Sequence, residues 1–414
     1  MQNEQLIDHL FRHQYGKMVS ILIRIFGLKN LEIIEDAVQD TFAKATIQWR
    51  KKVPENPEAW FTTAAKNRVI DLLRKLDADK NRIEKMNYSA SAIAFNNLFE
   101  KEEIQDSELR MIFTACHPKL DAKDQIAFAL KTIGGFSSSE IAAALLLKPE
   151  TVKKRLTRAK QTVISKKINF ELPVKKQLKA RLHNVLEVIY LIFNEGFHSN
   201  HNKLLVRKEL CGEALRLTKI ILTKEEFRCG ASYALFALLC LNSARLGAKV
   251  DENFNSIDLK NQDRTKWYLP LINLGTNALE KANGYPDYST YHIEAAIAIE
   301  HIKATTFQDT NWKQILELYK QLEQHQENTI ISLSIAVVLI ELNQPQEAFL
   351  IIQKLEPEAL EQRSYLFYGV KAKYYQCLGK KDKAISYLNV AIENVPNFAE
   401  KTYLIKKRDA LLKV

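Results

Sequence analysis

The chain has 414 residues, of which 46% are hydrophobic and 26% are charged, and this globular composition excludes wholesale disorder. Only 12 residues are Gly and 10 are Pro, roughly 5% of the chain against about 12% in average proteins. Few turns therefore need a positive or a fixed φ, which favours long helices over a many-turned β-sandwich. At about 150 residues per domain, the length predicts two to three domains.

The net charge of +11 is uneven along the chain. Residues 1–178 carry 30 Lys and Arg against 22 Asp and Glu, whereas the remainder carries 30 against 27. A positive N-terminal part favours an anionic partner, first nucleic acid and then a membrane, although a basic protein without such a partner has the same balance. The sequence shows no secretory leader, no apolar run long enough for a membrane span and no CxxC pair among its five cysteines, so we expect a cytoplasmic protein.

Helical periodicity covers residues 6–50 and 58–75, with a break at Gly27 and Asn30. The first segment carries an acidic stripe, which in a basic module indicates a protein partner or a solvated face. The second segment is basic and begins with Trp60 and Phe61, a combination that suits stacking of unpaired bases unless both rings belong to the core. The stripe consists of Glu35, Asp36, Gln39 and Asp40.

A helix-turn-helix is predicted within residues 106–167, after a polar linker at 76–105. Ser137 to Glu140 is a capping signal, and Pro149 occupies the first position of a basic helix. Residues 152, 156, 159 and 163 of that helix form an apolar stripe. The outward face should therefore read bases with its first residues and hold phosphates with the others, unless it is only a solvated basic face. Its outward residues are Glu150, Thr151, Lys153, Lys154 and Thr157.

Residues 178–414 are predicted to be almost entirely amphipathic helix. Near the end, the spacing of Ala384, Ala391 and Pro396 fits a tetratricopeptide unit of 34 residues, with a generic helical hairpin as the alternative. The loop with Glu195, His198 and His201 lacks the HExxH spacing of zinc enzymes, so we interpret it as a turn and expect no metal, cofactor or catalytic set.

In this order, the segments resemble bacterial extracytoplasmic-function sigma factors. Residues 31–42 and 57–74 resemble region 2 of that family, and residues 124–164 resemble region 4. Residues 110–118, 190–197 and 261–267 resemble the long subgroup that has a C-terminal tetratricopeptide-like extension, although Tyr268 stands where an acidic residue is expected. The implied fold is all-α: region 2 at 1–76, a linker at 77–105, region 4 at 106–170 and the extension at 171–414.

The resemblance implies a transcription initiation factor that binds core RNA polymerase and promoter DNA, without a membrane and without enzymatic activity of its own. It assigns polymerase binding to Asp36, Gln39, Asp40 and Phe42. It assigns the minus-ten promoter element to Asn67, Arg68, Asp71 and Arg74, and the minus-thirty-five element to Lys153, Lys154, Arg155 and Arg158. The extension is expected to regulate regions 2 and 4 in cis or to bind an unknown protein.

Three other functions fit parts of the sequence. A DNA-binding regulator could act without polymerase, although the acidic stripe argues against it. A tetratricopeptide adaptor could use the N-terminal part only for docking, and a hydrolase could use the loop at His198. Activity with added core polymerase separates the first two from a sigma factor, and a metal assay tests the third.

Overall fold

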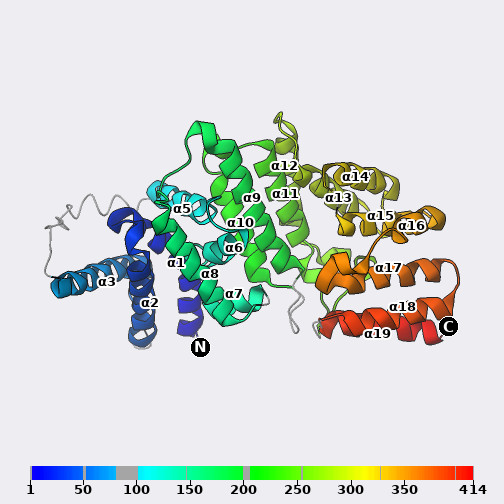
Figure 1. Ribbon diagram of the computed structural model, residues 1–414, viewed down its shortest axis with the longest axis horizontal. Coiled ribbons are helices and arrows are strands. Elements are labelled where there is room, and N and C mark those ends of the chain that lie inside the picture. The colour runs from blue at the N-terminus through cyan, green and yellow to red at the C-terminus, as the bar shows by residue number, and fades with distance from the viewer. Residues whose placement is uncertain are drawn as a thin grey trace. The chain divides into compact units, whose positions relative to one another are not determined.

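The computed structural model describes residues 2–49, 53–80, 101–145, 147–198, 206–252, 255–326, 328–396 and 398–413. These residues form helices and connecting turns without a strand (Figure 1), which confirms the predicted all-α class; Val250 and Ser256 make one isolated bridge. The chain divides into two compact units, Met1–Leu191 and Ile192–Val414. Each unit is described by itself below, as unit 1 and unit 2.

The first three helices of unit 1 are α1 (Gln2–Phe26), α2 (Leu31–Gln48) and α3 (Pro57–Lys80), and both α1 and α3 pack on α2. Gly27 ends α1 with φ of +85°, which a residue with a Cβ rarely adopts. The predicted break at this position is confirmed. The buried faces of α2 and α3 consist of Ile34, Ala37, Val38, Phe42, Ala45, Phe61, Ala65, Val69 and Leu73.

Unit 1 continues with α5 (Lys101–Ala115), α6 (Ala122–Thr132), α7 (Ser138–Ala144) and α8 (Pro149–Ser165), and α9 (Lys175–Phe197) follows. The side chain of Asp121 caps α6 by accepting a hydrogen bond from the backbone N–H of Lys123. α8 packs against both α6 and α7, which is the arrangement of a helix-turn-helix.

α1 holds these two groups of helices together, because it packs on α5 and α6 as well as on α2. A Cβ on Gly16 would lie 2.0 Å from the carbonyl oxygen of Ile133, so the two backbones meet where only glycine fits. Gly135, with φ of +69°, lies against the ring of Tyr15. Arg24 adds an ion pair of 2.5 Å to Glu103 on α5.

The predicted linker at 77–105 is helical at both ends, because α3 extends to Lys80 and α5 begins at Lys101. Residues 81–100 lie outside the described part. The sequence placed the start of the extension at 171, yet α9 contributes to unit 1: Arg181 donates a hydrogen bond of 2.5 Å to the carbonyl of Phe113, and Asn184 donates one of 2.5 Å to that of Cys116.

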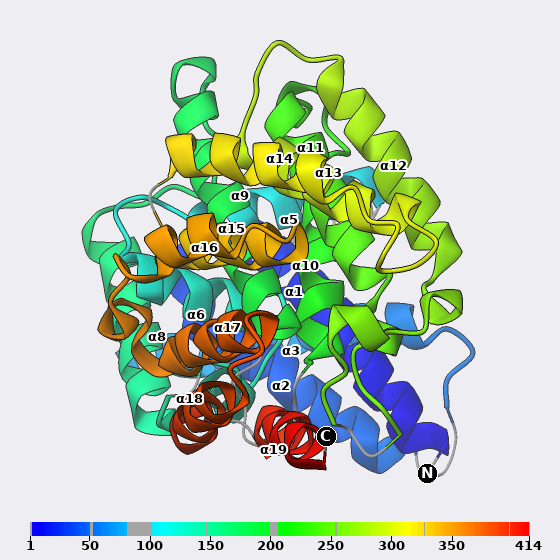
Figure 2. The same ribbon diagram turned by 90° about the vertical axis from the view of Figure 1, so that its right-hand side faces the viewer.

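Unit 2 is an array in which each helix packs mainly on its neighbours in sequence, as in helical-repeat proteins. Figure 2 shows α14, then α15 with α16, then α17 to α19, one after another. The helices are α10 (Lys208–Ile221), α11 (Gly230–Ser243), α12 (Leu269–Asn283), α13 (Thr290–Lys303), α14 (Trp312–His325), α15 (Thr329–Glu341), α16 (Pro345–Ile352), α17 (Ser364–Cys377), α18 (Lys381–Asn394) and α19 (Phe398–Lys413).

The small residues of the predicted repeat lie at helix contacts. Ala372 on α17, and Ala384 and Ala391 on α18, are all buried where these two helices pack together. Gly379 turns the chain between them with φ of +68°. The spacing therefore marks a real packing interface, and the tetratricopeptide-like interpretation stays a prediction.

The sequence expectation that no apolar run reaches the length of a membrane span was wrong for Gly230–Ala248. This stretch has 19 residues and a mean hydropathy of 1.2, long and apolar enough to cross a membrane. In the structure 67% of it is buried, because α11 packs against α10, α12 and α13. The stretch consists of α11 and the 3-10 turn at Leu246–Ala248, and most residues of α11 face other helices of unit 2.

The close approach at Gly16 predicts that Gly16→Ala lowers the melting temperature of the protein. The free energy of unfolding should fall by about 1–3 kcal/mol, because the backbone at the end of α6 must shift. Gly369→Ala is the matched control, since a Cβ in the middle of α17 would meet nothing within 4 Å. Alanine favours helix by about 1 kcal/mol over glycine, so this control should keep or raise the melting temperature. Calorimetry checks both, and equal behaviour of the two variants would contradict the packing argument.

Candidate nucleic-acid interface

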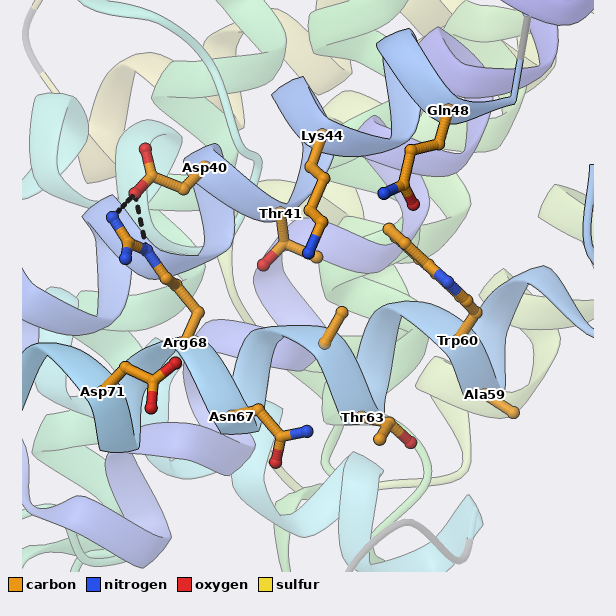
Figure 3. Close-up of a pocket in the computed structure, with 11 residues that line it drawn as sticks. Asp40, Thr41, Lys44, Gln48, Ala59, Trp60, Thr63, Asn67, Arg68 and Asp71 are labelled. Atoms are coloured by element: carbon orange, nitrogen blue, oxygen red, sulfur yellow. Dashed lines mark hydrogen bonds and ion pairs between the residues drawn. The ribbon is translucent and has the colours of Figure 1, made fainter. Parts of the chain in front are cut away.

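A groove of about 850 Å³ lies between α2 and α3 (Figure 3). It brings Asp40, a predicted polymerase-binding residue, next to predicted minus-ten residues on α3. Figure 3 shows side chains from both helices pointing toward the groove. The lining residues are Asp40, Thr41, Lys44 and Gln48 on α2, and Ala59, Trp60, Thr63, Ala64, Asn67, Arg68 and Asp71 on α3.

An ion pair between Asp40 and Arg68 closes one end of this groove (Figure 3). The Nε and Nη2 atoms of Arg68 donate to Oδ2 of Asp40 over 2.8 Å and 2.6 Å. The side chains are 50% and 38% exposed, and exposed pairs of this kind contribute only about 0–1 kcal/mol. The pair can therefore exchange for other partners, and a phosphate that takes Arg68 would release Asp40.

The aromatic residues divide into a buried group and one accessible ring. Phe61 is fully buried, with its ring centroid 4.1 Å from Phe42 and 4.8 Å from Trp49. Trp60 packs edge-on against Trp49 at 5.4 Å but is only half-buried and lines the groove. Of the two rings that the sequence offered for base stacking, Phe61 belongs to the core and Trp60 is available.

The four predicted polymerase-binding residues do not share one environment. Asp36, Gln39 and Asp40 are exposed along α2. Phe42 is 4% exposed and packs between α2 and α3, so its ring offers no surface to a partner. Phe42 therefore holds α2 against α3 and so positions the acidic stripe. The expectation that Phe42 itself contacts polymerase is corrected.

The other predicted minus-ten residues follow one another along α3. Asn67, Asp71 and Arg74 are exposed and separated by four and three residues, so they lie on one face of the helix. An amide, a carboxylate and a guanidinium on one face can hydrogen-bond to base edges and hold a phosphate. The face continues from the groove beside Trp60.

The helix-turn-helix forms as its capping residues require. The Ser137 hydroxyl accepts from the N–H of Glu140 at 3.1 Å, and the carboxylate of Glu140 accepts from the N–H of Ser137 at 2.8 Å. Pro149 begins α8, the predicted recognition helix. Its buried residues are Val152, Leu156, Ala159 and Val163, the four positions of the predicted apolar stripe.

The outward face of α8 keeps several groups available. Glu150, Lys153 and Lys154 are exposed, while Thr151 and Arg155 are half-buried. Among the residues that the structure describes, no carboxylate forms an ion pair with Lys153 or Lys154. These two lysines can therefore bind phosphate without first breaking a contact in the protein.

Arg158 has a different position from the one expected of a free DNA-binding cation. Its Nε and Nη2 atoms donate to the two carboxylate oxygens of Asp124 on α6, each at 2.5 Å. Asp124 is 2% exposed, and its hydrogen bonds raise the pKa of Arg158. The pair ties α8 to α6, so Arg158 holds the recognition helix in place.

Lys160 forms a contact that the sequence did not predict. Its Nζ lies 2.7 Å from the carboxylate of Glu35 on α2 and 3.6 Å from that of Glu32. Glu35 was expected in the exposed acidic stripe but is 3% exposed. Burial lowers the pKa of Lys160, but the two carboxylates outweigh this effect and raise it. The sequence did carry a signal for the burial of Glu35, since this residue follows Ile34 on the apolar face of α2.

One of the segments that resembled the long sigma subgroup, residues 261–267, has a structural role in unit 2. The Nη1 atom of Arg264 donates to the carbonyls of His301, in the last turn of α13, and of Ala304, which follows that helix. Its guanidinium lies 4.8 Å from the centre of the buried Trp267 ring. Tyr268, where an acidic residue was expected, is exposed and bonds through its N–H to the carbonyl of Ala244.

The loop considered for metal binding offers no such site in the described residues, where no group of three His, Cys, Asp or Glu side chains could hold an ion. Glu195 is partly buried, and burial raises its pKa. His201 lies outside the described residues.

Comparison with known families gives the identity of these modules. Residues 10–78 match the family described as Sigma-70 region 2, and residues 110–163 match Sigma-70, region 4. The chain belongs to the sigma-70 family. Residues 181–283 of this sigma factor match a family of unknown function, DUF6596. The predicted sigma assignment is therefore confirmed, and the matched regions lie on α1 to α3 and on α5 to α8.

Two relatives are similar to this chain, and one of them is a sigma factor. An uncharacterised protein of Rhizobium meliloti (strain 1021) is 31% identical over 400 residues, which cover 94% of this chain and 92% of that protein. The ferric citrate uptake sigma factor FecI of Escherichia coli (strain K12) is 26% identical over 154 residues, 37% of this chain and 85% of FecI. The chain is thus an extracytoplasmic-function type of sigma factor with a C-terminal extension, in a family of initiation factors that are not enzymes. No solved structure matches the chain.

The different surroundings of Lys154 and Arg158 predict different effects of two alanine substitutions. Lys154→Ala should keep the melting temperature and weaken promoter binding, with the slope of log K against log salt reduced by about 0.9 for each lost phosphate contact. Arg158→Ala should lower the melting temperature, because the buried carboxylate of Asp124 loses both hydrogen bonds. Calorimetry and binding at several salt concentrations check both variants. If Arg158→Ala leaves the melting temperature unchanged, the positioning role is refuted.

Proposed function

We propose that this sigma factor contacts core RNA polymerase through Asp36, Gln39 and Asp40, and opens promoter DNA with the groove between α2 and α3. The observation that carries the proposal is the Asp40–Arg68 ion pair, which joins a predicted polymerase residue to a predicted DNA residue. Because the pair is exposed, either partner can replace it with little loss of stability. Binding of polymerase and binding of DNA are therefore coupled at this position.

The groove suits the recognition of separated bases. The half-buried ring of Trp60 offers a stacking surface, and such stacking contributes about 1–3 kcal/mol per base. Asn67 and Asp71 on the same helix supply hydrogen-bonding groups for base edges. Arg74, one turn further along α3, is exposed and can bind the backbone of the strand.

α8 is the proposed reader of the minus-thirty-five element. Its N-terminal residues Glu150 and Thr151 would approach base edges, as in other helix-turn-helix proteins. Lys153, Lys154 and Arg155 would hold phosphates on either side. Arg158, with its guanidinium on Asp124, would set the angle of α8 rather than supply the main charge.

We propose that the extension regulates regions 2 and 4 in cis. The regulator and the sigma regions would then be parts of one cytoplasmic chain. The chain passes from unit 1 to unit 2 within α9, with no loop between them. A domain attached in this way cannot diffuse away from the rest of the chain, so weak contacts suffice for regulation. Binding of another protein by the extension is the second candidate, and it is favoured by the groove described in the next subsection.

Charge reversal in the acidic stripe predicts weaker polymerase binding. Asp40→Arg should reduce affinity for core RNA polymerase by an amount on the order of several kcal/mol, because like charges would meet at the interface. The fold should persist, since the Asp40 side chain is 50% exposed. Arg68→Ala is the control within the same ion pair: it should keep polymerase binding and lose promoter opening. A pull-down measures polymerase binding, and permanganate footprinting measures promoter opening. Normal polymerase binding by Asp40→Arg would refute the assignment of polymerase binding to the acidic stripe.

Two truncations test regulation in cis. Removing all residues after 197 should change transcription strongly while unit 1 stays folded, because α9 and its bonds from Arg181 and Asn184 are retained. Removing all residues after 175 deletes those bonds as well and should lower the melting temperature of the fragment. Run-off transcription with limiting core polymerase and circular dichroism measure both. Equal activity of the 1–197 fragment and the full chain would exclude regulation in cis.

A further inference from the structure

Unit 2 contains a second groove, of about 970 Å³, that neither the sigma regions nor the family comparisons assign. It lies among the 3-10 turn at Leu259–Asn261, α14, α15, α17 and α19. Its volume is at the upper end of the range of about 300–1,000 Å³ for pockets that bind small molecules. The floor consists of half-buried apolar and aromatic side chains, namely Trp312, Tyr319, Val337, Leu366 and Val370.

The rim of this groove carries more positive than negative charge. Four lysines line it against two carboxylates, and both carboxylates already have partners. Glu341 forms an ion pair with Lys373, and Asp258 accepts a hydrogen bond of 2.8 Å from the hydroxyl of Tyr403. The three other lysines form no ion pair with the residues that the structure describes; they are Lys260, Lys406 and Lys407.

Lys407 lies in surroundings that disfavour its charged form. Burial lowers its pKa, and the neighbouring charges of Lys373 and Lys260 lower it further, while Asp258 and Glu341 only partly oppose this effect. An anionic group placed among these lysines would favour the charged form of Lys407. Such a ligand would therefore gain from a charge that the folded protein leaves uncompensated.

We propose that this groove binds an acidic peptide segment with apolar or aromatic side chains, supplied by a second protein. The lysines on the rim would pair with its carboxylates, and the floor around Trp312 and Val370 would bury its apolar side chains. Nucleic acid fits less well, because aliphatic side chains such as Val337, Leu366 and Val370 offer no ring on which a base could stack. Charge favours a partner over this chain's own segments, since residues 81–100 carry two basic and two acidic groups and residues 199–205 carry one lysine and no acid.

The test uses the full-length protein and a fluorescein-labelled ten-residue peptide of Asp, Glu, Leu and Phe. Fluorescence anisotropy should show saturable binding. Binding should be lost when Asp and Glu are replaced by Asn and Gln, and also when Leu and Phe are replaced by Ser. Lys406→Glu should weaken binding at least tenfold. Lys401→Glu, which reverses another exposed lysine on the same helix outside the groove, should leave it unchanged.

The outcomes separate this proposal from its alternatives. Equal affinity of the two lysine variants, or no binding of the acidic peptide, overturns it. Tighter binding of a single-stranded oligonucleotide of matched charge, lost in Lys406→Glu, also overturns it by assigning the groove to nucleic acid. The assay contains neither polymerase nor promoter, so its result is independent of the proposed roles of α2, α3 and α8. Equal melting temperatures of the two variants exclude unfolding as the cause.

Discussion

The arrangement of unit 1 depends on the contact of α1 with the end of α6, where Gly16 meets the carbonyl of Ile133. This approach of two backbones leaves no room for a side chain, and it places Tyr15 against Gly135. Burial and the charge of Glu35 raise the pKa of Tyr15, so the ring stays neutral in this apolar contact. Because α1 also packs on α2, this contact links α2 to the helix-turn-helix.

Ion pairs between helices then decide which cations remain for DNA. Arg158 is fixed on Asp124, and Lys160 is fixed on Glu35, so neither presents a free charge. Lys153 and Lys154, on the same helix, make no such contact in the described residues. The basic helix thus contains two functional classes: cations that position α8, and cations that can release counterions from a phosphate backbone. The sequence alone does not separate these classes, because Lys153, Lys154, Arg158 and Lys160 all carry one positive charge.

The sequence could predict features set by neighbours along the chain. The capping box at Ser137, Pro149 at the first turn of α8 and the apolar stripe of that helix follow from local chemistry, and all are confirmed. The partners of Phe42, Glu35 and Arg158 could not be predicted, because each partner lies on another helix: Phe61, Lys160 and Asp124. The apolar stretch at α11 likewise cannot be distinguished from a membrane span by sequence alone, because its burial depends on the helices that pack on it.

Net charge distinguishes the two grooves and argues for different ligands. The groove between α2 and α3 contains Lys44 and Arg68 against Asp40 and Asp71, so its charges balance. Attraction of a phosphate backbone should be weak there, so the proposed recognition of DNA by this groove would depend on stacking on Trp60 and on hydrogen bonds to bases. The groove of unit 2 has an excess of lysines over a broad apolar floor. An acidic peptide with apolar side chains satisfies both features, since its carboxylates can pair with the lysines and its apolar groups can be buried on the floor.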